Sequence, residues 1–247
     1  MTTKENMNPN KTARIAGLLY LMIAIFGIFS MLYGPESLIV PGDATATVEN
    51  IAASESMYRL AFMGDLIGQV IFIFLVLLLY KLLKPVNRNI AVLMVVLVLV
   101  GVPIAMLNDL NQIAALLLSS GADYLTEFGA DQSNAQVNFY LDLYEHGLRI
   151  AYIFWGLWLF PLGYLVFKSG FLPRILGILL IIAGFGYLFE FVTLFLFPDL
   201  EFAIKMFTFW GEVLLALWLL IKGVNVEEWE KRCLLYTSDA ADEVVPV

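Results

Sequence analysis

Six long apolar blocks dominate the sequence, and they constrain its fold more than any other feature. They cover residues 13–33, 57–83, 89–119, 139–167, 172–197 and 203–221. Each block is close to or above the roughly 20 residues that an α-helix needs to cross a bilayer. None alternates apolar and polar residues as a membrane β-strand does, and an open sheet edge cannot lie in lipid. The pattern therefore predicts an all-α integral membrane protein, a bundle of six transmembrane helices that forms one domain over residues 13–222.

Composition agrees with a membrane location, because the chain is 61% hydrophobic and only 15% charged. The first block follows Lys4, Lys11 and Arg14, as the apolar part of a signal peptide does. Its apolar stretch exceeds the roughly 7–15 residues of a signal peptide, and the following text FSMLYGPES lacks a small-x-small cleavage site. We therefore interpret this block as a retained first helix, preceded by a cytoplasmic segment at residues 1–12.

Lysine and arginine residues are distributed unevenly between the two sides of the predicted bundle. Cytoplasmic loops of membrane proteins carry an excess of these residues. With the N-terminus inside, the outer side keeps only Arg59, Arg149 and Lys205. The inner segments then hold Lys4, Lys11, Arg14, Lys81, Lys84, Arg88, Lys168, Arg174, Lys222, Lys231 and Arg232. The asymmetry predicts that both termini are cytoplasmic, with residues 223–232 as a cytoplasmic tail.

The formal net charge of −8 is concentrated in the outer connections. The acids there are Glu36, Asp43, Glu49, Glu55, Asp123, Glu127, Asp131, Asp199 and Glu201. Such loops repel nucleic acid, and no basic patch with interleaved aromatic residues offers a binding site for it. Nucleic acid is therefore excluded as a partner.

The last segment, residues 233–247, departs from the pattern of the rest. The text CLLYTSDAADE has no hydrophobic periodicity and carries the one cysteine, Cys233. It resembles the translation of a transposon-based sequencing adapter, which we favour over a disordered tail. Without this segment the chain has no cysteine, and disulfide or thiolate chemistry is excluded.

The connections between the blocks contain recognisable local signals. Asp43, Thr45 or Thr47 can cap a short helix that leads into the second span. Pro103 and Pro161 should kink their helices, since each removes a backbone hydrogen bond. The inner loops KLLKPVNRN and KSGFLPR are short, which makes the spans that they join antiparallel neighbours.

Two stretches resemble the signature segments of a known family. They read YRLAFMGDLIGQVIFIFLVLLLYKLLKPVNRN and IFWGLWLFPLGYLVFKSGFLPRILGILLIIAGFGYL, and the closing helix GEVLLALWLLIKG is similar to that of the same family. The family is a bacterial six-helix integral membrane family catalogued as domain of unknown function (DUF) 4386. The resemblance covers residues 11–224 and implies the fold and a bacterial plasma membrane location. It implies no activity and transfers no catalytic residue.

Ionisable side chains within the spans are the candidates for function. Each costs about 2.5–3.5 kcal/mol at the centre of a helix on insertion scales, so such groups normally face the bundle interior and have partners. In the predicted orientation they all fall near the midplane or in the outer half, which favours an outward-facing acidic pocket. The candidate ligand-binding residues, with neighbouring amides included, are Asp65, Gln69, Asp109, Gln112, His146, Arg149, Glu190 and Glu212.

A structural interpretation competes with each of these assignments. Arg149 is the one strong cation at depth and a natural counter-ion for Asp65, Glu190 or Glu212, so these groups can form an ion network that only joins helices. Gln112, with Asn108 and Asn111, is typical of hydrogen bonds between helices. The single histidine, His146, suits a satisfied interfacial group. Residues 154–160, rich in tryptophan and phenylalanine, are typical of packing or of a lipid-facing belt.

Enzyme motifs are not recognisable in the sequence. The single histidine rules out a His-rich zinc site, and no nucleophile elbow or phosphate-binding glycine loop occurs. The string EEWEKR at residues 227–232 matches a membrane endopeptidase pattern, but no histidine follows it, so we interpret it as a solvated helix end. We predict no metal and no cofactor, and an intramembrane enzyme that uses Glu190 or Glu212 with His146 is the weakest hypothesis.

Two other hypotheses remain open. In the first, the protein binds or transports a small cationic or amphipathic ligand in the outward-facing acidic pocket. In the second, it is a structural or accessory membrane protein whose charges serve helix assembly only. The excess of acids over Arg149 favours the first hypothesis. The partners are then the lipid bilayer and a small molecule, while protein partners are not predicted.

Overall fold

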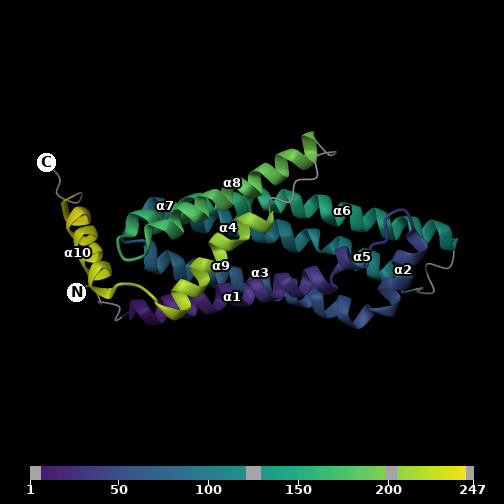
Figure 1. Cartoon of the computed structure of the whole chain (residues 1–247), viewed down its shortest axis with the longest axis horizontal. Coiled ribbons are helices and arrows are strands. Elements are labelled where there is room, and N and C mark those ends of the chain that lie inside the picture. The colour runs from purple at the N-terminus through teal and green to yellow at the C-terminus, as the bar shows by residue number, and fades with distance from the viewer. Residues whose placement is uncertain (1–6, 121–128, 198–204, 243–247) are drawn as a thin grey trace. The chain divides into compact units, whose positions relative to one another are not determined.

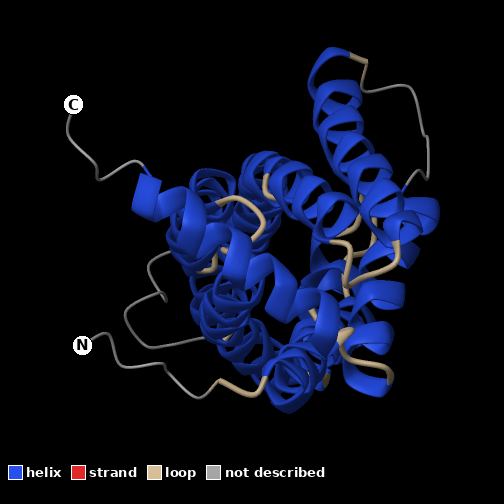
Figure 2. Ribbon diagram, turned by 90° about the vertical axis from the view of Figure 1, so that its left-hand side faces the viewer, coloured by secondary structure: helices blue, strands red, loops and turns tan. Residues whose placement is uncertain are grey.

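The structure, a computed structural model, describes residues 7–120, 129–197 and 205–242. In these ranges the chain consists of helices and loops without a strand (Figure 2), which confirms the predicted all-α class. A short 3₁₀ turn, Pro35–Ser37, follows the first helix. The α-helices are α1 (Pro9–Tyr33), α2 (Ala44–Ala53), α3 (Glu55–Leu83), α4 (Arg88–Asn108), α5 (Leu110–Ser119), α6 (Ala130–Leu157), α7 (Leu159–Ser169), α8 (Arg174–Leu196), α9 (Lys205–Ile221) and α10 (Val226–Asp242).

Length and composition identify the helices that can cross a membrane. Five helical runs of the described chain qualify: Pro9–Ser37, Glu55–Leu83, Arg88–Ser119, Asp131–Ser169 and Arg174–Thr193. The sixth predicted span, α9, qualifies only together with α10, from which it is bent by 101°. The structure therefore supports an integral membrane protein with five to six apolar spans.

The helix that contains the fourth predicted span begins before that span. The run Asp131–Ser169 has 39 residues, which at 1.5 Å per residue is roughly 58 Å and exceeds the roughly 30 Å hydrocarbon core. The predicted start at residue 139 is set by where hydrophobicity rises, but the helix itself continues into polar sequence. Residues 121–128 and 198–204, which include the outer acids Asp123, Glu127, Asp199 and Glu201 named above, lie outside the described residues.

The chain divides into two compact units. The first unit comprises residues 1–21, 72–100 and 152–247, and the second comprises residues 22–71 and 101–151. In the first unit α8 packs against both α7 and α9 (Figure 1). Glycines allow the closest approach there, because a Cβ atom on Gly163 of α7 would lie 2.7 Å from the carbonyl oxygen of Gly177 on α8.

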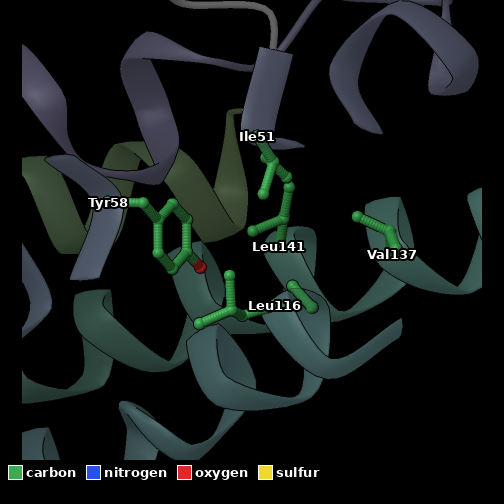
Figure 3. Close-up of a cluster of buried hydrophobic side chains, with 6 residues drawn as sticks. Ile51, Tyr58, Leu116, Val137 and Leu141 are labelled. Atoms are coloured by element: carbon green, nitrogen blue, oxygen red, sulfur yellow. The ribbon is translucent and has the colours of Figure 1, made fainter. Parts of the chain in front are cut away.

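The second unit has its own small apolar core. Ile51 of α2, Tyr58 of α3, Leu116 of α5 and Leu141 of α6 are at most 8% exposed. Figure 3 shows Ile51 against Leu141 and the Tyr58 ring reaching toward Leu116. The helix α2 is positioned by Asp43, whose side chain accepts a hydrogen bond of 2.9 Å from the Ala46 backbone N–H. This confirms Asp43, among the predicted alternatives, as the N-cap.

Two spans are each divided into two helices. The break between α6 and α7 falls at Trp158, and Pro161 follows in the first turn of α7. Because proline has no N–H, the carbonyl of residue 157 loses its helical donor, as the sequence predicts. In the third span α4 runs through Pro103, and a one-residue turn at Asp109 separates α4 from α5. The backbone N–H groups of Asp109 and Ile113 still donate to the carbonyls four residues earlier, so the helical run continues through this turn.

Residues 224–232 form hydrogen bonds with earlier segments of their own unit, the first. The indole N–H of Trp229 donates to the Leu82 carbonyl at 2.9 Å. The guanidinium of Arg232 donates to the carbonyls of Lys168 and Ser169 at 2.9 and 3.2 Å. The predicted solvated helix end thus has one attached face, while Lys231 pairs on its exposed side with two glutamates. The helix α10 continues through Cys233 to Asp242, where the sequence predicted no periodic structure.

Candidate functional site

The structure divides the predicted site residues between the two units. Glu190 on α8 and Glu212 on α9 belong to the first unit. The second unit contains Asp65, Gln69, Asp109, Gln112, His146 and Arg149. A single pocket that all eight residues share stays a prediction.

Asp65 and Asp109 lie close together in the second unit, with Gln112 between them. The Nε2 atom of Gln112 donates to Oδ1 of Asp109 at 3.2 Å, and the same side chain is near enough to Asp65 to influence its carboxyl group. The two carboxyl groups are near enough to interact electrostatically. Asp65 also accepts a hydrogen bond of 2.7 Å from the Ser30 hydroxyl of α1. We call Ser30, Asp65, Asp109 and Gln112 the paired-aspartate cluster.

Two members of this cluster are buried and two are partly exposed. Asp109 is 5% exposed and Gln112 is 0% exposed, while Ser30 and Asp65 are partly exposed. The hydroxyl of Tyr58, 1% exposed, donates to the backbone carbonyl of Gln112 at 3.0 Å and so attaches α3 to α5 beside the acids. Among the described residues the structure gives neither aspartate a basic partner. The paired-aspartate cluster is therefore rich in acceptor oxygens and contains no cation.

Gln69 lies one helical turn after Asp65 on α3, as its spacing of four residues predicts. Its Oε1 atom is buried and has no hydrogen-bond partner in the part of the chain that the structure describes. The Oε1 atom of Gln112 is likewise buried and has no hydrogen-bond partner among the described residues. Buried amide oxygens without a donor are uncommon, because leaving such a group unsatisfied costs about 1–3 kcal/mol.

Arg149 pairs within its own helix. Its guanidinium contacts the carboxylate of Glu145, one turn earlier on α6, which is the i,i+4 pair that the sequence spacing indicates. The ion pair that the structure gives Arg149 is thus local, and the predicted pairing with Asp65 in the same unit is not formed. His146, also on α6, has its Nδ1 atom 2.8 Å from the carbonyl oxygen of Asp142.

Glu212 has hydrogen-bond donors that the sequence interpretation missed. The Tyr20 hydroxyl of α1 donates to Oε2 at 2.5 Å, and the Tyr187 hydroxyl of α8 donates to Oε1 at 3.1 Å. We call Tyr20, Tyr187 and Glu212 the tyrosine–glutamate cluster. Trp158 packs on Tyr20 at a ring-centroid distance of 6.1 Å. Glu190 follows Tyr187 by three residues on the same helix, and its backbone carbonyl accepts from Thr193 at 3.0 Å.

The tyrosines were missed because hydropathy treats them as apolar. Tyr20 and Tyr58 stand in long apolar runs and resemble core residues or interface anchors. The sequence does contain a signal for these contacts. A buried tyrosine hydroxyl needs an acceptor, and because each apolar block contains few acceptors, the choice of partners is small. The aromatic stretch at residues 154–160 does serve packing, as the contact of Phe160 with Phe185 at 4.9 Å shows.

A cavity of about 240 Å³ lies elsewhere in the second unit. Its lining consists of Ile39, Val40, Pro41, Gly42, Asn138, Leu141 and Asp142. It therefore contains none of the predicted site residues. Among the described residues, no group of three or more histidine, cysteine, aspartate or glutamate side chains can hold a metal ion.

Comparisons with known proteins place the chain in a family. The family described as "Domain of unknown function (DUF4386)" matches residues 15–223. A protein of Archaeoglobus fulgidus described as "Uncharacterized protein" is 48% identical over 81 residues, which are 33% of this chain and 49% of that protein. The chain thus spans about half the length of this curated relative. No solved structure matches the chain.

Proposed function

This chain belongs to the DUF4386 family, and we propose that it binds or transports a small cationic or amphipathic ligand through the acids of its membrane-spanning helices. The apolar helical runs support an integral membrane protein. The ligand-binding part of the proposal rests on the paired-aspartate cluster.

The proposed topology has six spans, with both termini in the cytoplasm of a bacterium and the acids in the outer half of its plasma membrane. The distribution of lysine and arginine residues supports this orientation. The helix α9, with 17 residues, is roughly 26 Å long and is long enough to serve as the sixth span with little mismatch. An even number of spans returns the chain to the side from which it started.

The single observation that carries the proposal is the absence of a basic partner beside Asp65 and Asp109 within the described residues. A charged residue at the centre of a membrane helix costs about 2.5–3.5 kcal/mol, and two carboxyl groups close together repel each other when ionised. A bound cation would offset both costs. Arg149 does not serve this purpose in the structure, because it pairs with Glu145.

A structural or accessory role is the second candidate, and the tyrosine–glutamate cluster favours it. Each carboxyl oxygen of Glu212 accepts a tyrosine hydroxyl from another helix. Such a group joins α1, α8 and α9 and leaves no oxygen of Glu212 without a donor. If the paired-aspartate cluster acts in the same way, its acids serve assembly only.

Thermal stabilisation by ligands separates the two candidates. The full chain, purified in detergent, is heated with a panel of inorganic and organic cations, including choline and a polyamine. A ligand that binds only the folded state raises the unfolding temperature in proportion to the logarithm of its concentration above its dissociation constant. We expect at least one cation to stabilise the wild type and to lose this effect in Asp65→Asn and Asp109→Asn.

The matched control is Glu55→Gln on the same helix as Asp65. Glu55 is exposed and pairs with Arg59, so its removal should leave the cation response unchanged. Equal cation responses in the wild type and in both aspartate variants would rule out ligand binding at this cluster. Loss of stability in the variants, with no cation response in any protein, favours the structural role.

A further inference from the structure

The amide of Gln112 has an unusual environment for a buried side chain. Gln112 is 0% exposed, and its Nε2 atom donates to the carboxylate of Asp109 at 3.2 Å. The Oε1 atom of the same planar amide therefore lies beside the acids, and within the described residues it has no donor. An acceptor in this position indicates that a positively charged or hydrogen-bond-donating species belongs between the side chains.

Acceptor oxygens outnumber donors throughout the paired-aspartate cluster. The acceptors are the carboxyl oxygens of Asp65 and Asp109 and the amide oxygen of Gln112. The donors that the structure gives them are the Ser30 hydroxyl and the Gln112 amide. The Tyr58 hydroxyl does not help, because it donates to the backbone carbonyl of Gln112. Oxygen atoms in excess of donors are the ligand set of a hard cation.

Asp109 and Gln112 belong to one helical run, Arg88–Ser119. A one-residue turn at Asp109 separates α4 from α5, and the Asp109 side chain makes no capping hydrogen bond there. The carboxyl group of Asp109 is therefore not used to cap its own helix.

Burial restricts the size of the bound species. Asp109 and Gln112 are at most 5% exposed and Asp65 is partly exposed, and a cavity of about 240 Å³ in this unit is lined by other residues. An organic cation needs a pocket of several hundred cubic ångströms. A dehydrated inorganic ion needs only its oxygen ligands. The described residues also offer no site with three or more acidic, histidine or cysteine ligands, which argues against zinc-like metals.

We infer that the paired-aspartate cluster binds an alkali metal cation, with oxygens of Asp65, Asp109 and Gln112 as ligands beside the turn between α4 and α5. This inference rests on the proposed function and narrows its ligand to a dehydrated monovalent ion. The ion replaces the missing basic partner of the two carboxylates and the missing donor of the Gln112 amide.

The test measures unfolding of the full chain in detergent against LiCl, NaCl or KCl. The chloride salt of N-methyl-D-glucamine keeps the ionic strength constant. We expect one alkali ion to raise the unfolding temperature saturably, by about 5–10 °C at roughly 100 times its dissociation constant. The other ions should act less, because ligand spacing selects ion size. Amide hydrogen exchange of residues 105–113 should slow in the same salt.

Variants assign the response to the cluster. Gln112→Met keeps the length of the side chain but lacks its oxygen, and we expect the alkali response to fall at least tenfold in apparent affinity. Asp142→Asn, an exposed acid of α6 in the same unit, is the control and should respond as the wild type does. The wild-type salt series already tests the inference if an aspartate variant fails to fold.

The outcomes separate this inference from the proposed function. Stabilisation by organic cations alone, lost in Asp65→Asn, overturns the alkali-ion inference and keeps the proposed function. Stabilisation by divalent ions alone also overturns the inference. No response of the wild type to any cation overturns both. If the alkali response persists in Gln112→Met and Asp109→Asn, the ion does not bind at this cluster and the inference is overturned.

Discussion

The hydroxyl of Tyr20 donates a 2.5 Å hydrogen bond to Oε2 of Glu212, although the two residues are 192 positions apart in the chain. Tyr187 donates to the other carboxyl oxygen at 3.1 Å. One carboxyl group thus connects α1, α8 and α9. Polar contacts between membrane helices contribute modestly to association, typically about 0.6–2 kcal/mol each, but this one satisfies a carboxyl group that lipid would penalise.

Removal of the Tyr20 hydroxyl tests the importance of this contact. In Tyr20→Phe, Oε2 of Glu212 loses its donor in a partly buried environment, and we expect a loss of about 1–3 kcal/mol in unfolding free energy. Tyr187→Phe should cost less, because its hydrogen bond is longer. Chemical or thermal unfolding in detergent gives the difference. Tyr164→Phe is the control, since Tyr164 is 41% exposed, and a loss equal to that of Tyr20→Phe would contradict the prediction.

Trp229 provides a second test of contacts that hydropathy does not indicate. Trp229→Phe keeps an aromatic ring, smaller than the indole, but removes the hydrogen bond to the Leu82 carbonyl, so we expect a loss of about 1 kcal/mol. Protease cleavage of the α10 segment should become faster, because its attachment is weaker. Trp218→Phe on α9, where the ring is 37% exposed, should leave the cleavage rate unchanged. Equal cleavage of all three proteins would show that Trp229 does not hold α10.

The close approach of α7 and α8 predicts opposite effects of two glycine substitutions. A Cβ atom on Gly163 would lie 2.7 Å from the Gly177 carbonyl oxygen, so Gly163→Ala should separate the helices and cost about 1–3 kcal/mol. Gly27 on α1 has no atom within 4 Å of such a Cβ. Gly27→Ala should be neutral or stabilise by up to about 1 kcal/mol. Unfolding free energies of both variants check this, and similar values for the two would refute the packing argument.

The proposed orientation predicts which side of the membrane each connection faces. In a Cys233→Ser background, Ser133→Cys on α6 and Lys222→Cys after α9 place single thiols at the outer and inner ends of spans. A membrane-impermeant maleimide should label Ser133→Cys in intact cells and Lys222→Cys only after permeabilisation. Labelling gels give the answer directly, and the reverse pattern would invert the topology.

Local features of the protein could be predicted from the sequence. Each apolar block became a helix or an interrupted helix, because hydrophobicity over about 20 residues and the backbone's need for internal hydrogen bonds act segment by segment. The Asp43 cap and a disturbance of the helix at Pro161 could also be predicted, because each depends on the chemistry of one residue and its neighbours in the chain. The pair of Glu145 with Arg149 follows from a spacing of four residues. None of these features depends on how one helix faces another.

The partners of the buried acids were decided by the tertiary structure. The sequence marked Asp65, Asp109 and Glu212 as costly groups that need partners, but it indicated Arg149 as the counter-ion. The structure instead supplies Ser30 to Asp65, Gln112 to Asp109, and Tyr20 and Tyr187 to Glu212. These contacts depend on the rotation and depth of separate helices. Hydropathy fixes neither quantity, since a helix that is apolar on every side can turn about its axis at little cost, and only packing selects which polar groups meet.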